Sequence, residues 1–270
     1  MRDETVMEVG NPSEAFTNEL KSLEDHKDLI DQIQIMIPVR PADGLCFELE
    51  EQVCRWSQMG FDLRFLKDYM GGFIEVVRAN MALKFLKDSD RKFLMMLDSD
   101  VVPSLDLPVL LARHDKAMVG SPVPINLKEH GPTLNFTVSD AAGNWRFPSL
   151  ANHPKIPAHG LTKVAHIGTG AVVIRRDVLE AFTWEGEDVP FMVPSALRAE
   201  GLRTGNIRRG EDLEFCIQIR KKGFEIYADM DACSGHKKTL TLTVPEELRD
   251  PTMNTADWVT KETEYLVGEC

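Results

Sequence analysis

Several common signatures are missing from this sequence of 270 residues. Its apolar runs are far too short to span a bilayer, so we expect no integral membrane association. Residues 1–31 are polar and acidic and lack the charged-then-apolar pattern of a secretory signal. The five cysteines follow neither a CxxC pattern nor zinc-type spacing, and their odd number argues against a disulfide framework. We therefore expect a cytoplasmic protein with reduced thiols, in which Cys46, Cys54 and Cys216 are small core residues.

Acidic residues are concentrated at the two ends of the chain. Residues 1–31 hold nine Asp or Glu against three Lys or Arg, and residues 245–270 hold seven against two. Residues 32–244 hold 27 acidic and 26 basic residues, so most of the formal net charge of −12 belongs to the ends. The overall acidity therefore says little about what the central region binds. We expect an acidic tail or peripheral helix, one central domain and an acidic C-terminal segment, divided at these positions.

Strand and helix patterns alternate along the central region. Short apolar runs indicate strands at residues 32–39, 61–66, 93–97, 116–123, 165–175 and 224–228. Apolar residues at helical spacing, with Asp177 able to cap one helix and Gly223 able to close another, indicate helices at residues 45–59, 74–87, 106–114, 177–182 and 211–222. Residues 124–163 are rich in Pro, Gly, Asn and His, which is typical of a hairpin with long loops. The alternation predicts a single α/β domain with a mostly parallel central sheet.

The most informative segment runs from Phe93 to Asp100. Five apolar residues in succession indicate a strand buried on both faces, and Asp98 and Asp100 follow at its end. In an open α/β sheet such a strand end lines the crevice where ligands bind. Two neighbouring carboxylates repel each other and need a compensating positive charge. A divalent cation shared with substrate phosphates supplies that charge, although a solvated loop would carry the same residues.

Further polar segments occur in a fixed order around this one. They are Val77-Arg78-Ala79-Asn80 before it, then Gly168-Thr169-Gly170, Gly210-Glu211-Asp212 and Ser234-Gly235-His236 after it. In this order and spacing, roughly residues 32–240 resemble the GT-A glycosyltransferases, specifically the family-2-like group and its bacteriophage-type relatives. The resemblance implies a Rossmann-like GT-A domain, a UDP- or GDP-sugar donor and Mn²⁺ (or Mg²⁺) as cofactor.

The resemblance also assigns roles to individual residues. For the donor nucleotide it implies Pro38, Arg40, Arg78, Asn80, Asp98, Ser99 and Asp100. For the metal it implies Asp98, Asp100 and His236. For the pocket of the sugar and the acceptor it implies Gly168, Thr169, Gly170, Trp184, Arg208 and Arg209. For catalysis it implies Asp212 as the base that deprotonates an acceptor hydroxyl in an inverting reaction, with Glu211 beside it.

Elementary chemistry agrees with these roles. A diphosphate that leaves as an anion is stabilised by a metal held by carboxylates, and oxygen ligands with an imidazole suit Mn²⁺ better than Ca²⁺. A carboxylate at a helix start can accept a proton, although acids also occur there because they favour the helix dipole. Four arginines between residues 198 and 209 stand against Glu200 alone, so they can close over a diphosphate or contact a DNA acceptor, or form a solvated loop.

Two other functions stay open. A sugar-nucleotide nucleotidyltransferase normally has a glycine-rich phosphate loop after the first strand, but residues 38–44 contain one glycine, which weighs against it. A non-catalytic module that binds nucleotide sugars is the other alternative, and the complete acidic set argues mildly against it. Hydrolysis of the donor in the absence of an acceptor separates an enzyme from such a module.

Overall fold

The computed structural model describes residues 12–39, 44–66, 73–127, 131–139, 145–146, 159–197, 199 and 210–237. The chain divides into two compact units, Met1–Lys237 and Lys238–Cys270, and the described residues belong to the first. None of the described helices is long and apolar enough to cross a membrane.

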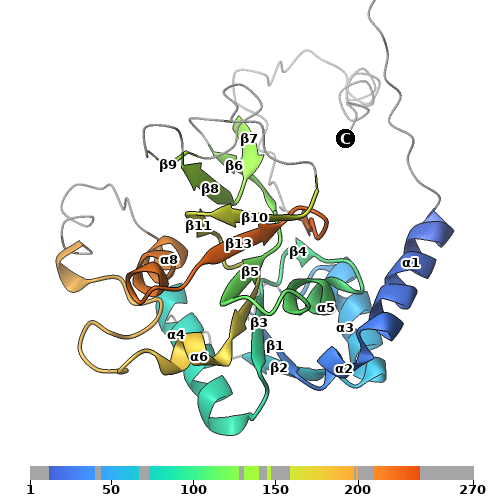
Figure 1. Ribbon diagram of the computed structural model, residues 1–270, viewed down its shortest axis with the longest axis horizontal. Helices are drawn as coiled ribbons and strands as arrows, with labels where there is room; N and C mark the ends of the chain where they lie inside the picture. The colour runs from blue at the N-terminus through green and yellow to red at the C-terminus, as the bar shows by residue number, and fades with distance from the viewer. Residues whose placement is uncertain are drawn as a thin grey trace, which may run out of the picture. The chain divides into compact units, whose positions relative to one another are not determined.

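The described part of the chain is built on one twisted sheet of seven strands (Figure 1). In spatial order these are β10 (Leu161–Val164), β13 (Ile226–Asp229), β5 (Met118–Gly120), β12 (Ala171–Arg175), β3 (Phe93–Leu97), β1 (Ile33–Pro38) and β2 (Asp62–Leu66). Strands β2, β1, β3, β5 and β13 run parallel to one another, whereas β12 and β10 run antiparallel to their neighbours. The predicted α/β domain with a mostly parallel sheet is confirmed.

Helices cover both faces of this sheet, and β3 shows why its sequence is apolar throughout. Leu94 and Met96 pack into a core beneath α4 (Ile74–Asp88), α6 (Arg176–Glu180) and α8 (Glu211–Lys221). Phe93, Met95 and Leu97 point the other way, into a core beneath α3 (Phe47–Met59) and α5 (Leu107–Ala112). Successive strand residues face opposite sides, so a strand covered on both faces needs an unbroken apolar run.

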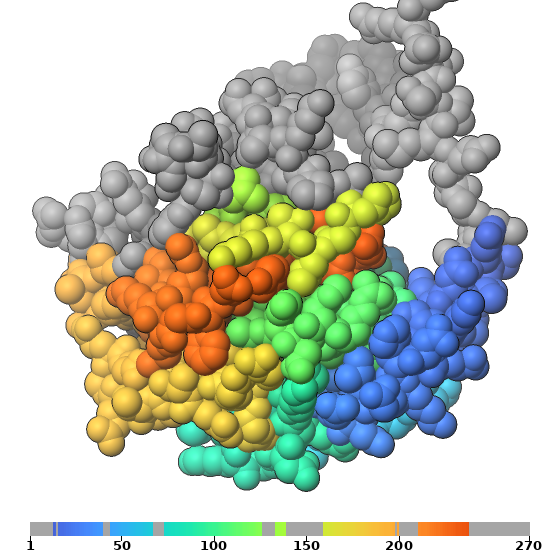
Figure 2. All heavy atoms as spheres, viewed as in Figure 1, coloured from blue at the N-terminus to red at the C-terminus, as the bar shows by residue number. Residues whose placement is uncertain are grey.

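The N-terminal helices extend the second of these cores. Helices α1 (Pro12–Asp25) and α2 (Lys27–Ile30) contact α5, and Figure 2 shows α1 in blue against the green segment of α5 and β5. Leu23 of α1 is buried in this core. Glu19 also accepts a hydrogen bond from the backbone N–H of Leu105 at 2.9 Å. Part of the acidic N-terminal region is therefore packed on the domain.

Short strands add smaller sheets at the edge where β3 ends. Strand β4 (Val101–Val102) pairs with β14 (Gly235–His236), and β6 (Pro124–Leu127) forms the expected hairpin with β7 (Gly131–Leu134). Strand β8 (Phe136–Ser139) lies between β9 (Trp145–Arg146) and β11 (His166–Ile167). The pairing of β14 with β4 brings residues near the end of the domain next to the Asp98–Asp100 segment.

Three details differ from the sequence predictions. The strand predicted at 165–175 is two strands, β11 and β12, because the chain bends at Gly168–Gly170. Asp177 does not cap α6; it pairs with Arg175, which occupies the cap position. Cys54 is exposed, whereas Cys216 is fully buried and burial raises the pKa of its thiol to about 12. Gly223 ends α8 as predicted, with a left-handed φ of 88°.

Candidate active site

A buried arginine lies where β3 ends. Arg78 comes from the inner face of α4 and is only 4% exposed. Its Nη2 donates to both carboxylate oxygens of Asp98, at 3.0 and 3.1 Å, and its Nε donates to Oε1 of Glu211 at 3.2 Å. The compensating charge that the sequence predicted for the aspartates is therefore supplied to Asp98 by the protein itself. Arg78 is therefore bonded to groups of the fold itself, and its expected role at the donor nucleotide stays a prediction.

The Gly168–Gly170 segment contacts the same ion pair. The register places Ala171 opposite Leu97, so Gly170 lies beside Asp98, and its carbonyl accepts from the backbone N–H of Asp98 at 2.7 Å. The carbonyl of Thr169 accepts from Nη1 of Arg78 at 3.0 Å. A Cβ on Gly170 would lie 3.2 Å from Oδ2 of Asp98, a tight contact. Glycine here leaves room for a carboxylate of the protein.

Two consecutive carboxylates begin α8. Glu211 pairs with Arg78, while Oδ1 of Asp212 accepts from the backbone N–H of Leu213 at 2.6 Å. Burial raises the pKa of Glu211, and Arg78 opposes this shift. Burial also raises the pKa of Asp212, more than the Leu213 N–H and Arg78 lower it. The two acids are thus neighbours with different partners.

Asp100 faces a histidine across the β4–β14 pair. Nε2 of His236 lies 3.3 Å from Oδ2 of Asp100, and its Nδ1 lies 2.8 Å from the carbonyl oxygen of Pro124. A carbonyl can only accept, so Nδ1 carries a proton, and in a neutral ring Nε2 then presents a lone pair toward the carboxylate. A backbone carbonyl that fixes the ring in this way is the usual support of a metal-binding histidine.

These contacts decide how well a metal fits. Asp100 and His236 form a prearranged pair of suitable ligand types, whereas both oxygens of Asp98 already accept hydrogen bonds from Arg78. Across the part of the chain that the structure describes, no group of three or more His, Cys, Asp or Glu side chains is placed to hold a metal ion. A cation bound here would therefore depend on oxygens of a substrate for the rest of its ligands.

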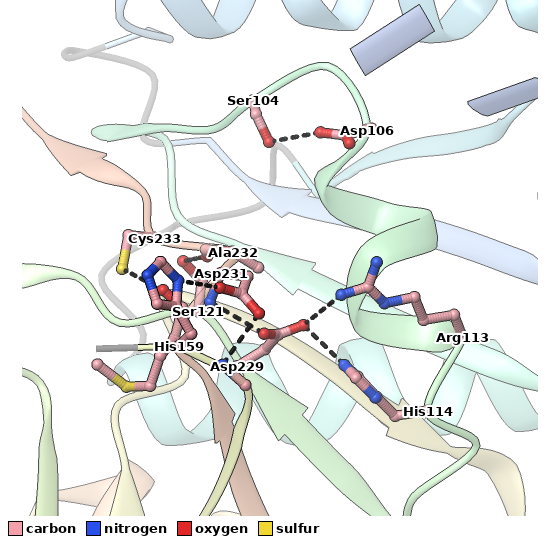
Figure 3. Close-up of polar contacts among 12 residues, drawn as sticks. Ser104, Asp106, Arg113, His114, Ser121, His159, Asp229, Asp231, Ala232 and Cys233 are labelled. Atoms are coloured by element: carbon pink, nitrogen blue, oxygen red, sulfur yellow. Dashed lines mark hydrogen bonds and ion pairs between the residues drawn. The ribbon is translucent and has the colours of Figure 1, made fainter. Parts of the chain in front are cut away.

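Several polar contacts hold the segment that leads from β13 to His236. Asp229 is fully buried at the end of β13, and it accepts from Nη2 of Arg113 at 3.4 Å and contacts Nε2 of His114 at 2.7 Å (Figure 3). Ser121 donates to the carbonyl of Ala232 at 2.5 Å. These contacts lead the chain from the sheet to the position where His236 meets Asp100.

The remaining predicted residues are spread more widely. Pro38 is buried at the end of β1, and the carbonyl of Ser99 accepts from the N–H of Cys46 at 2.9 Å. Asn80 is exposed and points away from Arg78, because residues two apart on a helix lie on nearly opposite sides. Trp184 packs against the core beneath α4, α6 and α8, with Nε1 donating to the carbonyl of Leu179 in α6 at 3.3 Å. Arg40, Arg208 and Arg209 lie outside the described residues.

Sequence reasoning missed several residues that shape the site. Asn135 bridges two neighbouring segments. Its Oδ1 accepts from the backbone N–H of Val123, and its backbone carbonyl accepts from the backbone N–H of Gly168. Lys237 also contacts two segments. Its backbone N–H donates to the carbonyl of Asp100, and its side-chain ammonium forms an ion pair with Glu48 at the start of α3. No local pattern marks these residues, since each acts on a segment far away in the sequence.

Comparison with known proteins finds structural likenesses at low sequence identity, among them two crystal structures. Neither a scan against models of protein families nor a search of curated proteins found a match. The crystal structure of A197 from STIV is similar over 80% of this chain and 98% of that one, with 16% identity and a TM-score of 0.46. The crystal structure of GalNAc-T7 with UDP, GalNAc and Mn²⁺ is similar over 78% of this chain but only 44% of that one, with 11% identity and a TM-score of 0.47.

Proposed function

We propose that this protein is a metal-dependent glycosyltransferase that moves a sugar from a nucleotide-sugar donor to an acceptor hydroxyl. The observation that carries the proposal is the meeting of two acidic pairs at one edge of the sheet. Asp98 and Asp100 follow β3, Glu211 and Asp212 begin α8, and Arg78 forms ion pairs with one member of each. One pair includes the partner of His236, and the other is partly buried with raised pKa values, so the two pairs suit different tasks.

Asp212 is the proposed general base. Burial raises its pKa, which brings a carboxylate closer to the pH at which it both stays ionised and accepts a proton readily. It takes the proton of the acceptor hydroxyl as that oxygen attacks the anomeric carbon. The bond from this carbon to the diphosphate breaks, and the nucleoside diphosphate leaves with the electron pair. Attack opposite to the leaving group inverts the configuration.

Asp100 and His236 are the residues that would hold Mn²⁺ or Mg²⁺. Such an ion supplies positive charge to the departing diphosphate. The chain's own contribution is orientation: Pro124 fixes the ring of His236 through Nδ1, and the Lys237 N–H fixes the carbonyl of Asp100. A histidine and a carboxylate held in this way lose little freedom when they bind a cation.

Calorimetry with nucleoside diphosphates tests the metal requirement. UDP and GDP are titrated with Mn²⁺ and with EDTA, and we expect at least one to bind about tenfold or more tightly with the metal. His236→Gln should lose this difference. His159→Gln is the matched control, because His159 also pairs with an aspartate, Asp231 at 2.8 Å, but on the exposed surface. Equal affinity with metal and with chelator would contradict the metal assignment.

Turnover separates an enzyme from a binding module. Release of nucleoside diphosphate from a panel of UDP-, GDP- and dTDP-sugars without acceptor measures hydrolysis, and binding without any release would favour the module.

A nucleic-acid acceptor is proposed only from the charge of the arginines at 198, 203, 208 and 209. Binding of duplex DNA that weakens steeply with salt supports that acceptor, and binding that ignores salt rejects it.

A further inference from the structure

One arginine joins the three segments that make the site. Through four hydrogen bonds Arg78 holds Asp98 after β3, the carbonyl of Thr169 between β11 and β12, and Glu211 at the start of α8. A guanidinium has five N–H donors in a rigid plane, so these bonds fix the three segments in one geometry. Lysine, a point charge on a flexible stem, would reproduce the charge but not the geometry.

The Gly168–Gly170 segment is shaped around this arginine. Thr169 contributes a backbone carbonyl, and Gly170 contributes the absence of a side chain where the Asp98 carboxylate lies. A Cβ on Gly168 would instead lie 3.3 Å from Cβ of Asn135. The two glycines therefore have similar crowding but different neighbours, and only Gly170 touches the ion pair.

The same arrangement separates the two acids of α8. Oε1 of Glu211 accepts a hydrogen bond from Nε of Arg78 at 3.2 Å, so Glu211 is held in this ion pair. Asp212 has its hydrogen bond from the Leu213 backbone and none from Arg78. Any task that needs a carboxylate oxygen free to leave its partner falls to Asp212.

We propose that Arg78 is a positioning residue. Glu211 joins the start of α8 to Arg78 through their ion pair, and Gly170 leaves space for the Asp98 carboxylate that Arg78 binds on its other side. Together they set the place of Asp212 relative to the β3 end. This inference rests on the proposed glycosyltransferase function, and it reassigns Gly170 from a sugar pocket to the support of an ion pair. To hold Arg78, Glu211 needs only an oxygen that accepts a hydrogen bond. Asp212, as the proposed general base, must be an ionised carboxylate.

Three measurements test the proposal on two pairs of variants: hydrolysis rate, affinity for UDP or GDP with Mn²⁺, and thermal midpoint, for Glu211→Gln against Glu211→Ala and for Gly170→Ala against Gly60→Ala. Gly60 follows α3 with a left-handed φ of 90°, so alanine there strains the backbone without touching the ion pair. Glutamine keeps an acceptor for Nε of Arg78, so we expect it to retain the rate within about tenfold, while alanine loses about 10²-fold or more. Gly170→Ala should lower the rate about tenfold or more at nearly unchanged nucleotide affinity, whereas Gly60→Ala should lower the thermal midpoint without lowering the rate.

The outcomes are distinct. A Glu211→Gln variant as inactive as Asp212→Asn would make Glu211 a proton-transfer group and overturn the proposal. Equal rates for Gly170→Ala and Gly60→Ala would also overturn it. If the unmodified protein neither binds nucleoside diphosphate nor hydrolyses any donor, the proposed function fails first, and this inference fails with it. If the unmodified protein binds nucleoside diphosphate and hydrolyses a donor, the results for the variants test this inference alone.

Discussion

Replacing Arg78 by methionine tests whether the fold depends on the buried ion pairs. The variant keeps an apolar stem of similar length but leaves Asp98 and Glu211 without their cation. Removing one partner of a buried pair costs about 3–5 kcal/mol, because an uncompensated charge stays inside. The side chains of Asp98 and Glu211 are 31% and 16% exposed, so water screens part of this cost. We therefore expect the lower end, a loss of about 3 kcal/mol in the free energy of unfolding.

Thermal or urea unfolding measures this loss. For a chain of this size, about 3 kcal/mol corresponds to a fall of roughly 6–12 °C in the unfolding midpoint. Lys163→Met is the control, because Lys163 and Glu225 form an exposed pair that should contribute about 1 kcal/mol or less. Adding Asp98→Asn and Glu211→Gln to Arg78→Met should restore most of the midpoint, since no charge is then left unpaired. If Arg78→Met behaves like Lys163→Met, Arg78 is solvated in solution and the reasoning is refuted.

Further predictions concern the same edge of the sheet. A Cβ on Gly210 would lie 2.9 Å from Oδ1 of Asp212, the movable end of a side chain, so Gly210→Ala should displace this carboxylate and lower donor hydrolysis about tenfold or more with little change in midpoint. Burial raises the pKa of Asp212, so its ionisation destabilises the fold as pH rises above the unfolded value of 3.8. Asp212→Asn should therefore unfold at a higher temperature than the unmodified protein at neutral pH, lose this advantage in acid, and hydrolyse donor about 10²–10⁴-fold more slowly; a destabilised variant or one with normal turnover contradicts the assignment. Asp229→Ala leaves Arg113 and His114 without their buried partner, and a drop of about 2–4 kcal/mol in urea unfolding is expected, whereas a change below about 1 kcal/mol would show that this carboxylate does not hold the segment before His236.

The central architecture was predictable from local patterns. The apolar run of β3 requires cover on both faces, and alternation of strands with helices then gives a mostly parallel sheet with acids at a strand end. Gly223 marked the end of α8 because a left-handed residue there favours glycine. The position of Asp98 and Asp100 at the edge of the sheet follows from these elements alone.

The partners of those acids depended on tertiary structure. Arg78 is separated from Asp98 by 20 residues and from Glu211 by 133, and His236 is separated from Asp100 by 136. No periodicity within α4 tells a buried arginine from a solvated one, because its inner face is chosen by what packs against it. The carbonyls of Thr169 and Pro124 have no sequence signature at all, since every residue carries one. Composition and local pattern determined which charges this protein has near the sheet edge, and only the packing of distant segments decided which of them neutralise one another and which stay available for chemistry.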